Sequence, residues 1–277
     1  MEIKFLGTAA YEGVPAPFCR CATCKKALRT GGRNLRTRSQ ALINDDLLID
    51  FNPDTVVHYQ TYAFDWEKIN DCLITHSHSD HLYVDDVAIA MDCYTHQHKK
   101  LNFYSGKAGY DMLKRVIDNP GMKNAASVTL VNPGDKFKIN GGKYIVTAYG
   151  ANHAKDTSPL FYAIEDKEGK RLLYAHDTGW FSNETWDLLE KTGKFDFVSL
   201  DCTGCNVGGA NWTDHHMGLK TDVKVIEKMK KSGIADDKTI FVVNHFSHNG
   251  GQTYDELVPD AEKQGIIVSY DGLEIDF

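Results

Sequence analysis

The chain has 277 residues, of which 42% are hydrophobic and 25% are charged, and its formal net charge is -7. A chain of this length can bury a sizeable core, and its ordinary composition excludes an intrinsically disordered protein. The acidic charge argues against a general binder of nucleic acid or anionic membranes, but not against a small phosphate ester bound by a few local cations.

The first residues predict a short strand over 2–6 that runs into a glycine turn. They lack the basic segment and the long apolar run of a secretory signal. No stretch of the chain reaches the roughly 20 apolar residues of a membrane span. We therefore expect a cytoplasmic protein without membrane contact, whose seven cysteines are thiols or metal ligands rather than a disulfide framework.

Strand-like and helix-like segments alternate along the rest of the chain. The pattern predicts a hairpin over 40–51 that turns at 44–46, a strand over 72–75, and helices over 106–118 and 183–191. Further strands are predicted over 128–139, 143–149, 160–165 and 171–175, followed by helix 219–232, strand 239–243, helix 254–263 and strand 266–270. Because no repeat or linker interrupts this order, we expect one α/β (α+β) domain over 1–277, with helices outside two packed sheets.

Four side chains of metal-ligand type follow the predicted strand 72–75 within six residues: His76, His78, Asp80 and His81. An extended His-x-His places both imidazoles on one side of the chain, and the next turn can direct Asp80 and His81 to a second point. The pattern therefore favours two adjacent metals. A histidine-rich surface loop is the alternative, but three of the 12 histidines of the chain are gathered here beside an aspartate.

A second cluster, C-x-C-x-x-C, is formed by Cys19, Cys21 and Cys24. It offers three soft ligands and lacks a fourth, which His248 could supply. Because His248 follows His245 by three residues, one loop could serve two sites. Three unrelated thiols are the alternative, but two nearby prolines and the short spacing make this a poor core segment. We expect a structural Cys3His zinc that joins the early loop to the late one.

The pattern His-x-His-x-Asp-His resembles the signature of the metallo-β-lactamase superfamily, and the resemblance extends over nearly the whole chain. It implies a four-layer αββα sandwich. The family's later ligands have candidates in the right order: His153, Asp177 before a Thr-Gly turn, and His245. The resemblance implies that zinc, manganese or iron ions occupy two sites, one held by His76, His78 and His153, the other by Asp80, His81 and His245, with Asp177 as the bridge.

The whole combination resembles one branch, the phosphoribosyl 1,2-cyclic phosphate phosphodiesterases of the carbon–phosphorus lyase pathway. The matching features are Gly-Thr at 7–8, Gly13-Val14-Pro15, the cysteine cluster, Leu200-Asp201-Cys202, His216 and the pair His245/His248. Pyrroloquinoline quinone B-type proteins share the cysteine cluster but lack the complete catalytic set. The branch implies a small or cyclic phosphodiester as the partner, no nucleic-acid polymer, and leaves a homodimer open.

For that reaction the resemblance implies His216 and Asp80 as catalytic residues. A hydroxide that bridges the metals would attack phosphorus, and His216 would protonate the leaving alkoxide. Hydrolysis of an ester, thioester or lactam, as in glyoxalase II-like relatives, is the main alternative. A transfer-RNA 3′-processing nuclease would need a long Gly/Pro-rich arm that the chain lacks. A non-catalytic, metal-stabilised binding protein is disfavoured, because pure structural sites fill their coordination with protein groups.

Two further groups of residues receive no functional assignment. The run Arg33, Arg36 and Arg38 is expected to be a solvated edge, with a contact to phosphate as the weaker alternative. The pair Cys202 and Cys205 is interpreted as a thiol at a strand end and a loop thiol.

Overall fold

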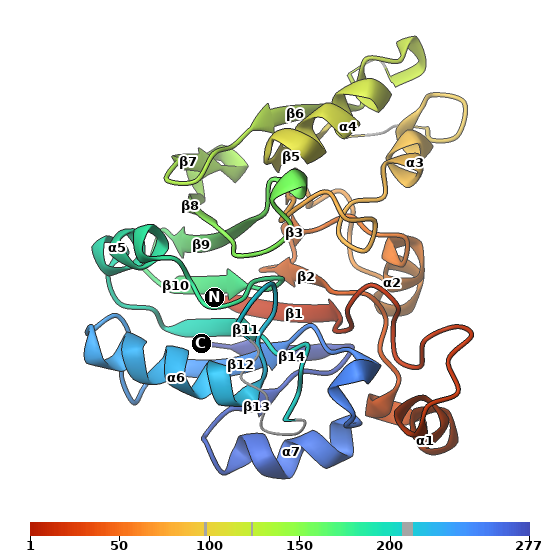
Figure 1. Ribbon diagram of the computed structural model, residues 1–277. Coiled ribbons are helices and arrows are strands. Elements are labelled where there is room, and N and C mark those ends of the chain that lie inside the picture. The colour runs from red at the N-terminus through yellow and green to blue at the C-terminus, as the bar shows by residue number, and fades with distance from the viewer. Residues whose placement is uncertain (97–98, 123, 207–212) are drawn as a thin grey trace.

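Two β-sheets packed face to face form the centre of the computed structural model, which describes residues 1–96, 99–122, 124–206 and 213–277 (Figure 1). The first sheet has the order β14 (Leu273–Asp276), β1 (Glu2–Gly7), β2 (Gln40–Ile43), β3 (Leu47–Ile49), β4 (Asp71–Leu73), β5 (Leu101–Ser105) and β6 (Ala126–Leu130). The second has the order β13 (Ile267–Val268), β12 (Ile240–Asn244), β11 (Phe197–Asp201), β10 (Arg171–Ala175), β9 (Leu160–Asp166), β8 (Tyr144–Gly150) and β7 (Lys136–Ile139).

Helices cover the outer faces of both sheets. Their bounds are α1 (Ala22–Thr30), α2 (Thr55–Tyr62), α3 (Val84–Val87), α4 (Lys107–Ile117), α5 (Asn183–Thr192), α6 (Leu219–Lys231) and α7 (Tyr254–Glu262). In the part of the chain that the structure describes, none of them is both long and apolar enough to cross a bilayer.

Three apolar clusters separate the layers. Between the sheets, Phe5 of β1 packs against Phe197 of β11, with their ring centroids 6.5 Å apart. Outside the first sheet, a cluster includes Leu113 of α4, and outside the second a cluster includes Val225 of α6. Because each sheet is apolar on both faces, it must be covered twice, which gives the four-layer αββα sandwich and confirms the expected fold.

Parallel pairing places several strand ends at one edge of the sandwich. In the second sheet, Ala175 of β10 pairs with Leu200 of β11, which pairs with Val243 of β12. In the first sheet, Ile49 of β3 pairs with Leu73 of β4, also in parallel. The residues that follow these strands therefore leave the sheets on the same side, which positions the site described below.

The predicted hairpin at 40–51, the helices at 106–118, 183–191, 219–232 and 254–263, and the other strands correspond to observed elements. The single strand predicted over 128–139 is wrong, because β6 and β7 lie in different sheets. The chain crosses between them at Asn132-Pro133-Gly134, where proline lacks an N–H for sheet pairing and Gly134 has a φ of 91°. The sequence pattern does not predict helices α1, α2 and α3 or strands β5 and β14, and for β11 it predicts only the strand end beside Cys202.

Candidate metal centre

The first group of candidate ligands joins two loops. His76 and His78 follow β4, and His153 follows β8, yet their ring nitrogens lie within 4.8 Å of one another. Nε2 of His153 is 3.2 Å from Nδ1 of His78. Nδ1 of His153 donates a hydrogen bond to the carbonyl oxygen of His215, 3.1 Å away, so Nδ1 carries the proton. Nε2 then presents its lone pair to the other two histidines of the first group.

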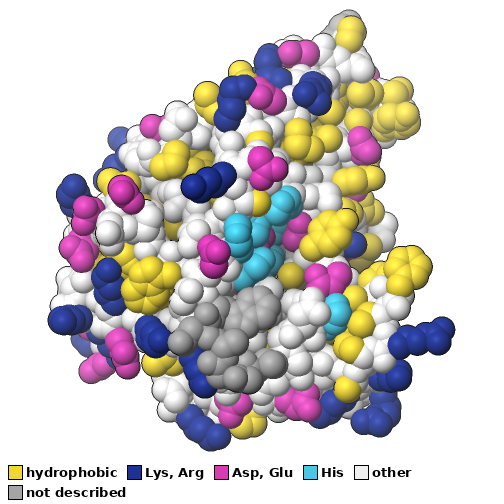
Figure 2. Space-filling view, in the orientation of Figure 1, with side chains coloured by type: hydrophobic (Ala, Val, Ile, Leu, Met, Phe, Trp, Pro, Cys, Tyr) yellow, Lys and Arg dark blue, Asp and Glu magenta, His cyan; other side chains and the backbone are white. Residues whose placement is uncertain are grey.

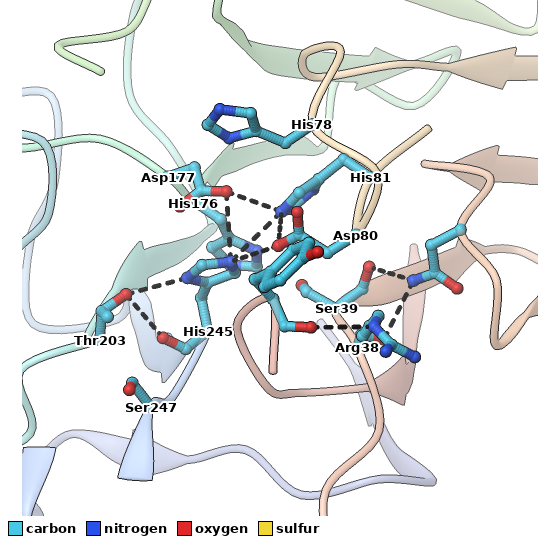
Figure 3. A network of polar contacts seen from close by, with 12 residues as sticks. Arg38, Ser39, His78, Asp80, His81, His176, Asp177, Thr203, His245 and Ser247 are labelled. Atoms are coloured by element: carbon cyan, nitrogen blue, oxygen red, sulfur yellow. Dashed lines mark hydrogen bonds and ion pairs between the residues drawn. The ribbon is translucent and has the colours of Figure 1, made fainter. Parts of the chain in front are cut away.

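The second group, which Figure 3 shows at close range, contains Asp80, His81, Asp177 and His245, all buried. Oδ2 of Asp177 is 2.7 Å from Nε2 of His81 and 3.2 Å from Nε2 of His245. Asp177 also reaches the first group, because its Oδ2 lies 3.3 Å from Nε2 of His76. The two groups of candidate ligands are therefore neighbours, and Asp177 lies between them.

The spacing of these atoms fits bound divalent ions. Two imidazole nitrogens on one tetrahedral zinc lie about 3.3 Å apart, from Zn–N bonds of about 2.0–2.1 Å. Nε2 of His81 and Nε2 of His245 are 3.2 Å apart. In the described residues, Oδ1 of Asp80 is buried without a hydrogen-bond partner, as expected of an oxygen that awaits a cation.

Charge in the second group is balanced by protons when no cation is present. Burial disfavours the charged form of His245, but Asp177 and Asp80 outweigh it and raise its pKa to about 10. Burial also opposes ionisation of Asp177, but His245 and His81 hold the pKa of this carboxyl well below its usual range. A bound cation can replace the proton that His245 holds beside Asp177, because metal ligands must be deprotonated.

Asp50, to which the sequence assigns no role, orients His81 by contacting Nδ1, the ring nitrogen that faces away from the other candidate ligands. It follows β3, is fully buried, and accepts a hydrogen bond from Nδ1 of His81 at 2.6 Å. The amide and hydroxyl of Thr75 donate to the same carboxylate at 2.8 and 2.9 Å. The proton on Nδ1 leaves Nε2 of His81 as the ligand atom, the usual arrangement of a carboxylate behind a metal-binding histidine.

His216 lies beside the second group rather than within it. Its Nδ1 is 3.2 Å from Oδ2 of Asp201, 3.2 Å from Oδ1 of Asp177 and 3.2 Å from the hydroxyl of Thr203. Burial alone would lower the pKa of His216, but Asp201 and Asp177 raise it above the ordinary value. Thr203 also contacts Nδ1 of His245 at 2.9 Å, so one hydroxyl links both rings.

A cavity of about 440 Å³ opens over these residues. In the space-filling view, histidine side chains gather at the centre of one face, where the surface is hollowed (Figure 2). The lining combines ligand candidates with His216 and with loop residues of both chain halves: Ala10, Tyr11, Glu12, His78, Ser79, Asp80, His153, Asp177, Thr203, His216, His245, Ser247 and Asn249. The candidate ligands are thus open to a small molecule, unlike a closed structural site.

The cysteine cluster forms a separate group with His248. Nδ1 of His248 is 3.6 Å from the sulfurs of both Cys19 and Cys21. A tetrahedral zinc with Zn–S bonds of about 2.3 Å and Zn–N bonds of about 2.0 Å separates sulfur and nitrogen by roughly 3.5 Å. The arrangement of Cys19, Cys21, Cys24 and His248 therefore fits the predicted Cys3His site.

Backbone amides support negative charge on all three sulfurs. The amides of Ala16, Cys21 and Cys24 donate to the sulfurs of Cys24, Cys19 and Cys21 at 3.4, 3.5 and 3.4 Å. The last of these bonds also caps the start of α1. Burial opposes ionisation of Cys21, but hydrogen bonds to its sulfur lower its pKa to about 6, whereas burial raises the pKa of Cys24 to about 12. A soft cation would remove the proton retained on Cys24.

Two residue groups without a sequence-based role are now placed. The expectation of a solvated arginine run is wrong for Arg36, which is 6% exposed, donates to the carbonyl of Ser269 at 2.7 Å and lies 3.9 Å from the centre of the Phe246 ring. Cys202 and Cys205 are buried in the core beside α6, and within the described residues neither belongs to a candidate metal group.

Solved structures share this architecture at low sequence identity. A diphosphatase of the PhnP family has a TM-score of 0.74 at 20% identity, over 100% of this chain and 98% of its own. Zinc-bound PqqB from Methylobacterium extorquens has a TM-score of 0.75 at 20% identity, over 100% of both chains. The short form of human tRNase Z has a TM-score of 0.66 at 15% identity, over 100% of this chain and 99% of its own.

No curated protein sequence matches this chain. The family model described as the β-lactamase superfamily domain matches residues 46–243, which include every candidate ligand of the two His/Asp groups except His245. Taken with the sandwich, this match shows that the chain belongs to the β-lactamase superfamily, whose members are metal-dependent hydrolases.

Proposed function

We propose that the protein is a metal-dependent phosphodiesterase that acts on a small or cyclic phosphodiester. The observation that carries the proposal is the position of His216, which lines the cavity next to both His/Asp groups without belonging to either. His216 also forms a further candidate metal group with Asp177, Asp201 and His245. An ester hydrolase needs a group that protonates its leaving oxygen when that oxygen is a poor leaving group, and an imidazole suits this role.

The hydrogen bonds around His216 favour a general acid. With Nδ1 facing Asp201 and Thr203, the opposite nitrogen, Nε2, has no hydrogen-bond partner among the described residues. Asp201 also accepts from the amides of Met217 and Asp177 at 2.9 and 3.0 Å, so its own position is fixed. The imidazole is therefore held in one orientation, with its free nitrogen available to a substrate in the cavity.

Bound divalent ions in the two His/Asp groups would supply Lewis acidity and a nucleophile derived from water near neutral pH. Zinc or manganese suits the mixed nitrogen and carboxylate ligands, and zinc suits the Cys3His group. The solved structures with this fold include a diphosphatase and a tRNase, which supports a substrate that contains phosphate. The acidic chain and its compact cavity favour a small substrate over a polymer.

A substrate panel tests the proposal. Protein loaded with zinc or manganese is assayed on bis-p-nitrophenyl phosphate, cyclic nucleotides, a ribosyl cyclic phosphate and thioesters. We expect turnover of one or more diesters, loss of turnover with a chelator, and recovery when the metal is returned. Hydrolysis of thioesters without hydrolysis of any diester would contradict the phosphodiesterase assignment.

The variant His216→Ala tests the general acid. Loss of the imidazole should lower kcat about 10²–10⁴-fold on a diester with a poor alkoxide leaving group. The loss should be much smaller for a p-nitrophenyl ester, whose leaving group needs little protonation, and the metal content should not change. His215→Ala is the matched control, because this neighbouring side chain is 55% exposed. Equal losses on both esters would assign His216 to binding or metal retention instead.

A further inference from the structure

Glu12 brings an additional negative charge into the cavity, outside both His/Asp groups. It lies on the loop between β1 and α1 and lines the cavity together with Tyr11 and Ala10. The carboxylates of Asp80 and Asp177 belong to the candidate metal groups, whereas Glu12 does not. Bound divalent ions would neutralise the first two charges and leave that of Glu12 to act on a substrate.

Apart from its histidines, the cavity offers no basic side chain to offset this charge. No Lys or Arg lines it within residues 1–96, 99–122, 124–206 and 213–277, and residues 207–212, Val-Gly-Gly-Ala-Asn-Trp, contain no charged side chain. Phosphomonoester sites usually supply such cations, because arginine and lysine bind the dianion directly. Here a phosphoryl group in the cavity would meet both the metal groups and the carboxylate of Glu12.

The position of Glu12 is fixed from two sides. Its Oε1 accepts a hydrogen bond from the Ser247 hydroxyl at 2.5 Å and lies 3.5 Å from Nε2 of His248. Because Nδ1 of His248 faces the cysteine sulfurs, Nε2 carries the proton and points to Glu12. The backbone is held as well, since the Ala10 amide donates to the carbonyl of Phe246 at 2.9 Å. The carboxylate is therefore a fixed charge rather than a mobile surface group.

We propose that Glu12 is a specificity-determining residue that restricts the cavity to phosphodiesters, which carry one negative charge, and disfavours phosphomonoesters, which carry two. The inference rests on the proposed phosphodiesterase function and names the charge of its substrate. The charge of Glu12 also affects turnover, because hydrolysis of a diester by water produces an alcohol and a monoester. The product gains a charge that the substrate lacked, so Glu12 also weakens product binding.

Ligand binding tests this inference without turnover. The probes are phenylphosphonate, a dianion at mildly alkaline pH, and its methyl ester, a monoanion, measured by calorimetry on the metal-loaded protein. Glu12→Gln keeps the shape and removes the charge. We expect the preference for the monoanion over the dianion to fall about tenfold, the scale of one extra like charge several ångströms away in a partly solvated site. In activity assays, the ratio of kcat/KM for bis-p-nitrophenyl phosphate and p-nitrophenyl phosphate should fall similarly.

Two controls separate charge from structure. Glu12→Asp retains the charge and should retain the preference, and Glu168→Gln removes one negative charge from an exposed turn far along the chain and should change nothing. Zinc content reports whether the Cys3His group is intact in each variant. An unchanged preference in Glu12→Gln, or an equal change for both probes, would overturn the inference. Failure of the wild type to hydrolyse any diester would instead overturn the proposed function, since the phosphonate measurements do not depend on it.

Discussion

The hydrogen bond from His81 to Asp50 makes a testable contribution to metal binding. In Asp50→Asn, Oδ1 can still accept from the amide and hydroxyl of Thr75, 2.8 and 2.9 Å away. The new amide NH2 replaces Oδ2 and faces Nδ1 of His81, which was 2.6 Å from that oxygen. Two donors then oppose each other in a fully buried position. His81 can relieve the conflict only by moving its proton to Nε2, the atom that would bind the metal.

We expect this change to weaken the second metal site about 10–100-fold, as loss of such outer contacts usually does, which corresponds to roughly 1.4–2.7 kcal/mol. The first group, His76, His78 and His153, does not contact Asp50 and should keep its affinity. Competition with a chromophoric chelator measures both affinities, and mass spectrometry of the metals counts the ions retained.

A matched control distinguishes metal binding from general damage to the core. Asp71→Asn changes another buried aspartate, which accepts from Asn102, Tyr104 and the amide of Asn140 and lies outside the candidate site. It should lower the stability, because one acceptor is lost, and leave both metal affinities unchanged. The reasoning about Asp50 is refuted if its variant binds both metals as tightly as the wild type, or if Asp71→Asn weakens them equally.

Two further predictions concern the metals as structural elements. Cys21→Ser should remove about one zinc per chain and lower the midpoint of thermal unfolding more than the activity per folded molecule, because none of the four residues of the Cys3His group lines the cavity. Cys93→Ser, at an exposed thiol, is the control, and an unaltered zinc content would contradict the assignment. Removal of all metals by a chelator should lower both the activity and the melting midpoint, since a ligand that binds only the folded state stabilises it. Readdition of zinc or manganese should restore both. Equal melting midpoints with and without metal would refute the expected stabilisation.

The ligand candidates could be predicted from the sequence because their chemistry is concentrated in short segments. Residue type and spacing alone predict a metal site at His76, His78 and Asp80, and they predict another at the cysteine cluster. The sequence identifies His153, Asp177 and His245 as metal ligands only through the resemblance to the metallo-β-lactamase superfamily. Their convergence depends on the parallel register of β10, β11 and β12, which no local pattern encodes.

Residues that orient the ligands left weaker signals. Asp50 and Asp201 each stand at the end of an apolar strand, where an unpaired buried carboxylate would be costly, and this position could have marked both. Asp201 belongs to a motif that matches the resembling branch, but the motif assigns it no role. Thr203 and Glu12 gave no sequence signal. Glu12 contacts Ser247 and His248 only after the first loop pairs with the last through the bridge between Ala9 and Phe246. Thr203 contacts His216 and His245, which lie 13 and 42 residues further along the chain. The burial of Arg36 was missed for the same reason.

Three residues of the site adopt strained backbone conformations at strand ends. Asp50, Asp177 and His245 have positive φ angles of 69°, 50° and 65°, a left-handed conformation that costs about 1–2 kcal/mol for a residue with a side chain. Glycine would relieve this strain, but it would remove the carboxylate or imidazole that the site requires. The same backbone turn ends the pairing of each strand and directs these side chains to a common point between the sheets. Strain of this kind accumulates at functional sites, so the fold is locally less stable where the metal groups are assembled, and the ions that bind there would offset that loss.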